Sequence, residues 1–467
     1  MTRPDTVTSI HGNQYRLGQE LGRGGQGAVF AVEGGRLAVK LLRDRSARAR
    51  EALRDQLAMV GRLPLENLAV ARPIELLRPP HVGYVMELYT GMVSLRALLR
   101  PPKTATSIVQ WYFDMGGLRR RLRLLARTAE VLSQLHGRGL VYVDPSPHNV
   151  FVSEDRGAVE VRLIDTDNLR TATAAGRALY TPGYGAPEVV TQTGIPSSLS
   201  DAHAFAVIAF ETLALVHPLL GDAVRDGAPE MEEQALAGRL PWIDDENDDS
   251  NRSSDGIPRN IVLSAALRDD FQRTFGPGLR TPSERPGLSR WAEHLHRAAD
   301  RTVICPGCSG TFFYDKKDCP WCEAPRPSFI IAAVLLWDPQ RLRRDKGGVL
   351  DSAPGVVRKS SGKPRVVDAV ALSDGETVDL TERITHGTSR RTPRLRVSFV
   401  EDRLTLEALD GERWRLVSSD GRRERYLASR PLDVTVGDTG AAWVVHSGPP
   451  DQLHRVIRFD LRRGGNR

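Results

Sequence analysis

Two neighbouring stretches, Asp144-Pro145-Ser146-Pro147-His148-Asn149 and Leu163-Ile164-Asp165-Thr166-Asp167, decide the fold. They place an aspartate, an asparagine and a second aspartate at the ends of short strand-like runs. These are the oxygen donors that position a hydroxyl group and hold Mg²⁺ against a nucleoside triphosphate. Aspartate and asparagine are also common in turns, where their side chains bond the backbone. The two stretches therefore become informative only together with the motifs around them.

A glycine-rich run near the N-terminus, Gly22-Arg23-Gly24-Gly25-Gln26-Gly27-Ala28-Val29, has the pattern G-x-G-x-x-G-x-V. Glycines let backbone N–H groups turn toward phosphates without a Cβ in the way. Dinucleotide-binding proteins share the pattern, but there a helix follows the glycines. Here the chain continues as a strand, and Leu37-Ala38-Val39-Lys40 forms another after a Gly34-Gly35 turn. A glycine loop between strands, leading to a strand that ends in lysine, is typical of a kinase-type nucleotide site.

Lys40 is the residue that we expect to bind the α- and β-phosphates. The residues expected around the nucleotide on the same strands are Gly22, Gly24, Gly27, Val29 and Ala38. An acidic residue of the next helix, at about 47–63, should orient the lysine. We predict Glu51 for this role, although counting back from Pro64 favours a position between Arg54 and Gln56. Without an acid at Lys40, the active conformation would have to be held in another way.

The segment Gly83-Tyr84-Val85-Met86-Glu87-Leu88-Tyr89 has the pattern of a strand that runs into a connector. In a kinase-type site, backbone groups of Glu87 and Tyr89 would hydrogen-bond adenine, and only the place of the segment relative to the other motifs favours this role. Met86 would then close the back of the nucleotide pocket. An ordinary strand and loop is the alternative.

Asp144 is the candidate base that accepts the proton of a substrate hydroxyl group, and Asn149 and Asp165 are the candidate Mg²⁺ ligands. Magnesium prefers hard oxygen donors and is usually held by one or two carboxylates together with phosphates. Turn-capping side chains are the alternative reading of all three residues.

Three downstream features support the same kind of site. The motif Ala186-Pro187-Glu188 comes after the Asp165 stretch. If Glu188 is buried, it needs a cationic partner, and we predict that this partner is Arg285. Asp201 is expected to cap the apolar helix that begins at Ala202. It could also bond the backbone near the Asp144 loop.

Together, and over roughly residues 15–300, these motifs resemble the eukaryotic-like serine/threonine protein kinases of bacteria. The resemblance implies an α+β bilobal fold in a domain at about 10–300, with a β-rich lobe at about 10–88 and a helical lobe at about 89–300. It implies ATP and Mg²⁺ as cofactors and a protein as substrate. The chain itself is one of the substrates that the resemblance allows. A protein phosphatase is an implied signalling partner. One divergent subgroup, associated with tellurium-resistance gene clusters, has Asp-Thr-Asp in place of Asp-Phe-Gly, as Asp165-Thr166-Asp167 here, and a zinc ribbon after the kinase domain.

Two departures from the family pattern lie beside the candidate base. Tyr142-Val143 stands where the family has His-Arg, and this arginine normally pairs with a phosphate on the activation loop. Ser146 stands where the family has a lysine that helps to neutralise the transferring phosphoryl group. An ATP-binding pseudokinase scaffold is therefore the main alternative. The retained lysine, aspartates and asparagine favour an active enzyme, and Ala186-Pro187-Glu188 disfavours a small-molecule phosphotransferase.

The four cysteines of the chain form two C-x-x-C pairs, Cys305/Cys308 and Cys319/Cys322. Four thiolates in a tetrahedral array bind structural Zn²⁺, so residues 301–325 are predicted to form a four-cysteine zinc ribbon. A redox pair is the alternative. The ribbon could serve equally as an adaptor or as a rigid spacer.

The tail, at about 328–467, alternates polar and apolar residues and is predicted to be an all-β domain. Asp410-Gly411 and Asp420-Gly421 are candidate hairpin turns. A phosphopeptide-binding β-sandwich would suit a kinase, but its expected loop motif is not found. The ligand of this domain is left open.

The chain has 467 residues and a net charge of +7, with lysine and arginine spread along it. This spread does not favour nucleic acid as a partner. The N-terminal residues have no apolar core of a signal peptide. The longest apolar run, Phe329 to Trp337, is about half of the ~18 residues that a membrane span requires. We therefore expect a cytoplasmic protein with no membrane partner.

Overall fold

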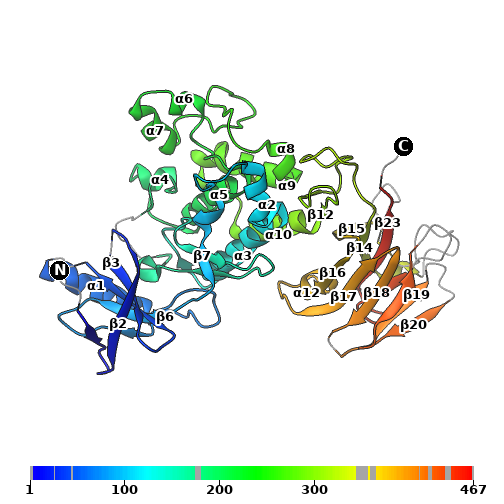
Figure 1. Ribbon diagram of the computed structural model, residues 1–467, viewed down its shortest axis with the longest axis horizontal. Helices are drawn as coiled ribbons and strands as arrows, with labels where there is room; N and C mark the ends of the chain where they lie inside the picture. The colour runs from blue at the N-terminus through cyan, green and yellow to red at the C-terminus, as the bar shows by residue number, and fades with distance from the viewer. Residues whose placement is uncertain are drawn as a thin grey trace. The chain divides into compact units, whose positions relative to one another are not determined.

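The computed structural model describes residues 4–25, 27–43, 46–173, 180–342, 356–357, 364–409, 411–418, 423–436 and 443–464. The chain divides into two compact units, Met1–His296 and Arg297–Arg467 (Figure 1). No helix of the described residues is long and apolar enough to cross a membrane.

The first lobe of unit 1 is a six-stranded antiparallel sheet in the order β1-β2-β3-β4-β6-β5. The strands are β1 (Thr6–Thr8), β2 (Gln14–Arg23), β3 (Gly27–Val32), β4 (Leu37–Leu42), β5 (Glu75–Leu76) and β6 (Gly83–Glu87). Alternation along β3 and β4 sends Phe30 and Val39 into a common core with Leu17 and Val85. This arrangement follows from the period of two residues in a pleated strand.

The helix α1 (Ala47–Val60) begins at Ser46, whose hydroxyl group accepts a hydrogen bond from the backbone N–H of Ala49 at 3.3 Å. Such a cap satisfies one of the free N–H groups of a first turn. Leu57 of this helix is buried with Leu42 of β4 and Tyr84 of β6. The contact holds α1 against the sheet next to the lysine strand.

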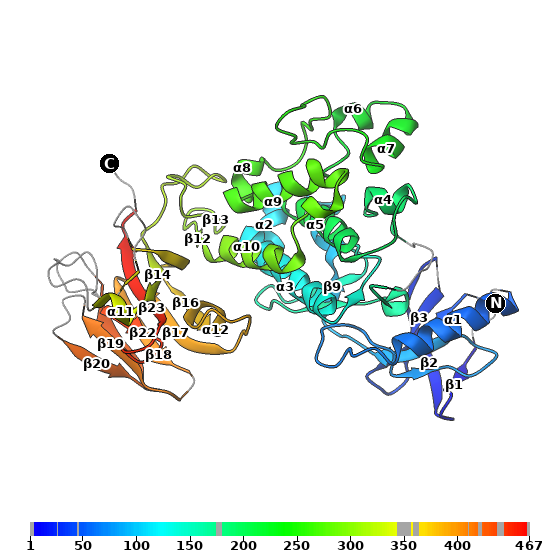
Figure 2. The same cartoon turned by 180° about the vertical axis from the view of Figure 1, so that it is seen from behind.

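The second lobe of unit 1 is mainly helical (Figure 2). Its helices are α2 (Ile108–Asp114), α3 (Gly117–Gly137), α4 (Pro187–Val190), α5 (Ser198–Ala214), α6 (Asp222–Arg225), α7 (Pro229–Leu236), α8 (Arg259–Val262), α9 (Ala265–Phe275) and most of α10 (Leu288–Asp300), whose last residues belong to unit 2. Fully buried aromatic side chains from α5, α9 and α10 pack edge to face, as Phe210 and Phe271 do at 5.0 Å between ring centroids. Short strands carry the loops of the site: β7 (Met92–Ser94), β8 (Leu140–Val141), β9 (Val150–Ser153), β10 (Val161–Leu163) and β11 (Arg170–Thr171).

Two predictions about this lobe have different outcomes. Arg285 binds both carboxylate oxygens of Glu188, at 2.7 and 2.8 Å, as predicted. The prediction that Asp201 caps the apolar helix is wrong, because α5 begins earlier and Ser197 caps it in a capping box with Ser200. Asp201 lies within the first turns of α5 and is fully buried. Its carboxylate bonds the backbone just before Asp144, which is the alternative role predicted for it.

Unit 2 contains two β-sheets that enclose one apolar core. The six-stranded sheet consists, in order, of β15 (Val366–Ser373), β14 (Phe329–Trp337), β23 (His454–Arg462), β22 (Trp443–His446), β19 (Trp414–Ser418) and β20 (Glu424–Leu427). The four-stranded sheet consists of β16 (Glu376–Thr381), β17 (Pro393–Val400), β18 (Arg403–Ala408) and β21 (Leu432–Thr435). Two short helices, α11 (Pro339–Leu342) and α12 (Glu382–Thr385), accompany them.

The two hairpin predictions in unit 2 fare differently. Gly411 lies between β18 and β19, which belong to different sheets, so a hairpin at Asp410-Gly411 is wrong. Asp420-Gly421 lies outside the described residues, although the strands on either side, β19 and β20, do pair antiparallel. A turn motif alone cannot distinguish a hairpin from a crossover between sheets, because the partner of a strand is set by tertiary packing.

Candidate active site

Strand pairing in the first lobe gathers most of the residues predicted to surround a nucleotide. Lys40 lies opposite Val29 of β3 on one side and Tyr84 of β6 on the other. Ala38 lies opposite Met86. Gly22 pairs with Val29 at the end of β2, and the N–H of Gly24 donates to the carbonyl oxygen of Gly27 at 2.9 Å. Gln26 lies outside the described residues.

The predicted adenine contacts lie where the first lobe passes into the second. Glu87 is the last residue of β6 and is exposed, while Tyr89 is partly buried. The hydroxyl group of Tyr89 donates to the carbonyl oxygen of Val70 at 3.4 Å, which ties the connector to the first lobe. The adenine role of these residues stays a prediction.

Lys40 joins the two lobes through two ion pairs. Its ammonium group binds Asp165, and it binds Asp167 at 2.6 Å. Burial alone would lower the pKa of Lys40, but the charges of Asp167 and Asp165 outweigh it and raise the pKa. Lys40 is therefore charged at neutral pH in spite of its burial.

Glu51 does not reach Lys40. It is exposed on α1, and the side chain that α1 does send to this region is that of Gln56. The amide nitrogen of Gln56 donates to the carbonyl oxygens of Asp167 at 3.2 Å and Leu169 at 3.0 Å. The expected acid is replaced by an amide because the face of α1 that carries Glu51 points to solvent. The other expected position, between Arg54 and Gln56, is the one that the structure favours.

The Asp144 loop holds a second group of polar contacts. One carboxylate oxygen of Asp144 accepts from the backbone N–H of Thr181 at 2.7 Å, and the other accepts from its hydroxyl group at 3.1 Å. The amide nitrogen of Asn149 donates to the carbonyl oxygen of Asp144 at 3.1 Å. Thr181, which lies 37 residues after Asp144 in the chain, is thus brought to the loop that carries Asp144 and Asn149.

Asp201 holds the backbone just before Asp144 through hydrogen bonds. Its carboxylate accepts from the backbone N–H groups of Tyr142 at 2.7 Å and Val143 at 2.9 Å, and His136 lies 2.9 Å away. Val143 has a φ of +82°, a conformation that costs a β-branched residue free energy. The fully buried Asp201 therefore holds a strained backbone immediately before Asp144.

The three residues that depart from the family pattern here, Tyr142, Val143 and Ser146, are all buried. The hydroxyl group of Tyr142 donates to the carbonyl oxygen of Ile164, next to Asp165. Tyr142 therefore links the two decisive stretches of the sequence. Ser146 is fully buried, and its hydroxyl group has no hydrogen-bond partner among the described residues. This uncharged hydroxyl group cannot neutralise a phosphoryl group.

Sequence reasoning misses two residues of this site. In the sequence, Asp167 stands out only as the replacement for glycine in Asp165-Thr166-Asp167, and Thr181 is not assigned to the site. A second carboxylate two residues after Asp165 could have indicated a second partner for Lys40. Nothing in the local sequence indicates the contact between Thr181 and Asp144.

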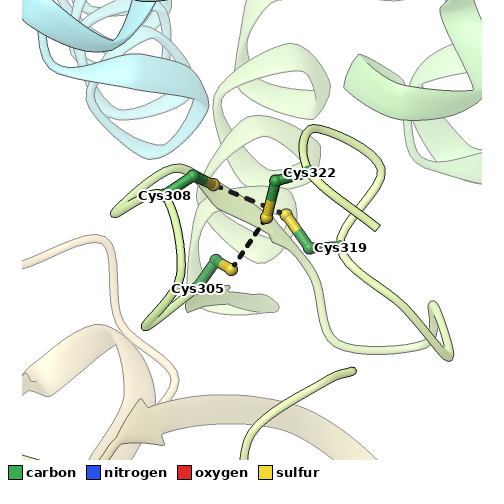
Figure 3. Close-up of side chains that lie close together, drawn as sticks. All are labelled: Cys305, Cys308, Cys319 and Cys322. Carbon is green, nitrogen blue, oxygen red and sulfur yellow. Dashed lines mark hydrogen bonds between the residues drawn. The ribbon is translucent and has the colours of Figure 1, made fainter. Parts of the chain in front are cut away.

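The four cysteines of unit 2 lie close together (Figure 3). All four sulfur atoms lie within 4.8 Å of one another, with Cys305–Cys322 at 3.6 Å and Cys308–Cys319 at 3.7 Å. Ligands ~2.3 Å from a tetrahedral zinc ion are ~3.8 Å apart, whereas a disulfide bond is ~2.05 Å long. The cluster is compatible with zinc. Two of the cysteines, Cys305 and Cys319, are buried in one apolar cluster with Phe312 and Phe329.

Residues 15–270 match the family model of the protein kinase domain. The chain belongs to the protein kinase family. The bilobal α+β fold predicted from the motifs is therefore confirmed, and the cysteine cluster and the later β-sheets follow it along the chain.

The proteins similar to this chain include bacterial serine/threonine kinases. The serine/threonine-protein kinase Pkn1 of Myxococcus xanthus is 28% identical over 223 residues, which are 45% of this chain and 30% of that protein. Pkn2 of the same organism is 27% identical over 256 residues, 52% of this chain and 28% of the relative. The DNA damage-responsive serine/threonine-protein kinase RqkA of Deinococcus radiodurans is 27% identical over 321 residues, 62% of this chain and 44% of the relative. The chain thus spans less than half the length of each of these relatives.

Proposed function

We propose that this chain is an ATP- and Mg²⁺-dependent serine/threonine protein kinase that phosphorylates protein hydroxyl groups in bacterial signalling. The observation that carries the proposal is the ion pair between Lys40 of the first lobe and Asp165 of the second. Their side chains are 125 residues apart in the chain and meet beside the Asp144 loop. Phosphoryl transfer depends mainly on such positioning of charges.

Each residue has a role in this proposal. Lys40 binds the α- and β-phosphates under the glycine loop, and backbone groups of Glu87 and Tyr89 hold adenine. Asn149 and Asp165 hold Mg²⁺, which would supply positive charge against the phosphates. The nitrogen of Asn149 is turned to Asp144, so its oxygen, a hard donor, is the atom left for a cation. Asp144 accepts the proton of the substrate hydroxyl group.

A groove beside the Asp144 loop supports a protein as substrate. It has a volume of about 530 Å³, and its lining includes Tyr180, Pro182 and Val190 together with Glu230 and Glu233 of α7. Two of the lining residues, Tyr180 and Pro182, flank Thr181 in the chain, and Thr181 contacts Asp144. A peptide bound there would have its hydroxyl group near the proposed base.

One observation favours the alternative, an ATP-binding pseudokinase scaffold. The buried Ser146 cannot supply the positive charge that a lysine brings to this position in the family. A scaffold would bind ATP through Lys40 and regulate partner proteins without turnover.

Incubation of the chain with radiolabelled ATP and Mg²⁺, followed by mass spectrometry, tests the proposal. We expect label in the protein itself or in a generic substrate, with phosphate on Thr171, Thr173 or Thr181. The first two of these are exposed and the third contacts Asp144. If ATP raises the melting temperature of the protein but no phosphate is transferred to any protein, the scaffold is the correct reading.

The pH dependence of transfer gives a second test. Burial raises the pKa of Asp144, hydrogen bonds from Thr181 lower it, and the charges of Asp165 and Asp201 raise it again, with a raised pKa as the net result. A base accepts a proton only when deprotonated, so the rate should fall as the pH drops through this pKa. Thr181→Val removes the hydrogen bond from the hydroxyl group, a bond that lowers the pKa of Asp144, so the acidic limb of the rate profile should move to higher pH. Thr181→Ser keeps the bond and is the control, and equal profiles for the two variants would contradict the assignment of Asp144.

The remaining expectations are part of this proposal. The cytoplasm is the proposed location, because four cysteines in metal-ligand spacing suit a reducing compartment. The chain itself and a protein phosphatase are the proposed partners. Membership of the tellurium-resistance subgroup stays a prediction.

A further inference from the structure

Lys40 takes both of its carboxylate partners from one short segment of the second lobe. Asp165 and Asp167 lie on either side of Thr166, and both bind the ammonium group. The side chains differ in exposure, because that of Asp165 is 26% exposed and that of Asp167 only 2%. Asp165 can therefore face a ligand, whereas Asp167 faces the protein interior.

The helix that provides the lysine's acid in most kinases provides none here. The acidic residues of α1 are Glu51 and Asp55, and both are exposed. Gln56 is directed to the site, but its amide group bonds backbone carbonyl oxygens rather than Lys40. Among the described residues, the ion pairs of Lys40 are those with Asp165 and Asp167.

The surroundings of Asp167 would otherwise disfavour a charge. One carboxylate oxygen of Asp167 and the hydroxyl group of the fully buried Tyr84 have no hydrogen-bond partner among the described residues, and Asp165 binds the same ammonium group as Asp167. Burial of a carboxylate is unfavourable unless it is paired with a cation. Lys40 is the group that compensates this burial, so the position of each side chain depends on the other.

We propose that Asp167 is the carboxylate that positions Lys40 for phosphate binding, in the place that an acid of α1 takes in other kinases. This inference rests on the proposed function. Asp167 is a positioning residue, because it acts through Lys40. It leaves Asp165 available to a cation while the lysine stays oriented.

The segment that carries Asp167 is fixed to the first lobe by uncharged contacts. The hydroxyl group of Thr166 donates to the carbonyl oxygen of Ala71 at 2.8 Å, and Gln56 holds the carbonyl oxygens on the other side. The orientation of Lys40 is thus set by this segment rather than by a charge on α1. A shift of α1 would break hydrogen bonds of Gln56 but leave the ion pair intact.

The test compares Asp167→Asn with Asp167→Glu and with the control Asp55→Asn, which changes an exposed acid of α1. We expect Asp167→Asn to weaken binding of ATP with Mg²⁺ by about 10- to 100-fold, measured as the KM for ATP and as the Kd from calorimetry. Asp167→Glu should recover part of the affinity, and Asp55→Asn should match the parent. The melting temperature without nucleotide shows whether each variant is folded.

A relocated carboxylate makes the test specific. Gln56→Glu in the Asp167→Asn background places an acid on α1, at the position that faces the segment, and should bind ATP better than Asp167→Asn alone. Parental ATP affinity in a folded Asp167→Asn variant would overturn the inference, and so would a double variant that is no better than the single one. If the parent binds ATP but transfers no phosphate, the proposed function fails, while the Kd values still decide the role of Asp167.

Discussion

Replacement of Asp165 by alanine should lower the rate of phosphoryl transfer by about 10³-fold or more. The carboxylate of Asp165 is partly exposed beside Lys40 and is the proposed Mg²⁺ ligand with Asn149. Groups that neutralise the transferring phosphate are worth about 10³- to 10⁵-fold in rate. Lys40 keeps Asp167 as a partner in this variant, so its charge is not left unpaired. The loss should therefore appear in kcat, measured from initial rates with radiolabelled ATP.

The control for this experiment is Asp155→Ala. Asp155 is an exposed loop residue whose carboxylate accepts from the backbone N–H of Gly157 at 2.8 Å. The Asp155→Ala variant should transfer phosphate at the rate of the parent protein. Asp165→Asn should in addition require more Mg²⁺ for half of its maximal rate, because an amide binds the cation more weakly than a carboxylate. Full activity of Asp165→Ala would remove this residue from the proposed site.

Loss of one cysteine should unfold the ribbon of unit 2. The purified protein should contain about one equivalent of zinc, and Cys319→Ser should contain none. Structural zinc contributes about 10–16 kcal/mol in zinc-finger peptides, and Cys319 is fully buried against the same apolar cluster as Val303 and Phe312. With the metal gone, β12 (Thr302–Ile304) and β13 (Thr311–Phe313) lose the link that joins their loops.

Zinc content by atomic emission and hydrogen exchange of the β12 and β13 amides would measure this effect. A chelator should reproduce it in the parent protein. Asp315→Asn, at an exposed position of the same segment, should keep its zinc and its protection from exchange. A parent protein without metal, or with cysteines in disulfide bonds, would show that the ribbon prediction is wrong.

The order of the motifs is sufficient to predict the fold. The order along the chain is the one that the kinase family has: Lys40, then Asp144 and Asn149, then Asp165. The spacing of the cysteines predicts a metal cluster. These patterns can be recognised in the sequence because each motif consists of a few residues close together in the chain. Backbone turns, strand ends and C-x-x-C knuckles are local structures.

The identity of the acidic residue that binds Lys40 is harder to predict, because it depends on which face of α1 is turned toward the site. Residues three or four apart share a helix face, so Glu51 and Asp55 point together. Leu57 and Val60 turn the opposite side of α1 to the sheet, and Gln56 comes with them. The apolar positions could have shown this orientation, but they could not have shown that Asp167 takes the place of the missing acid.

The sequence alone determined the chemistry that this chain carries: a lysine, two aspartates and an asparagine in kinase order, and four thiols in zinc spacing. Only the tertiary structure decided which of the carboxylates meet the lysine and which residue contacts Asp144. The physical reason is that Lys40 and Asp167 lie 127 residues apart. Their ion pair exists only when the two lobes close, and a buried charge selects its partner from whatever the packing brings within reach.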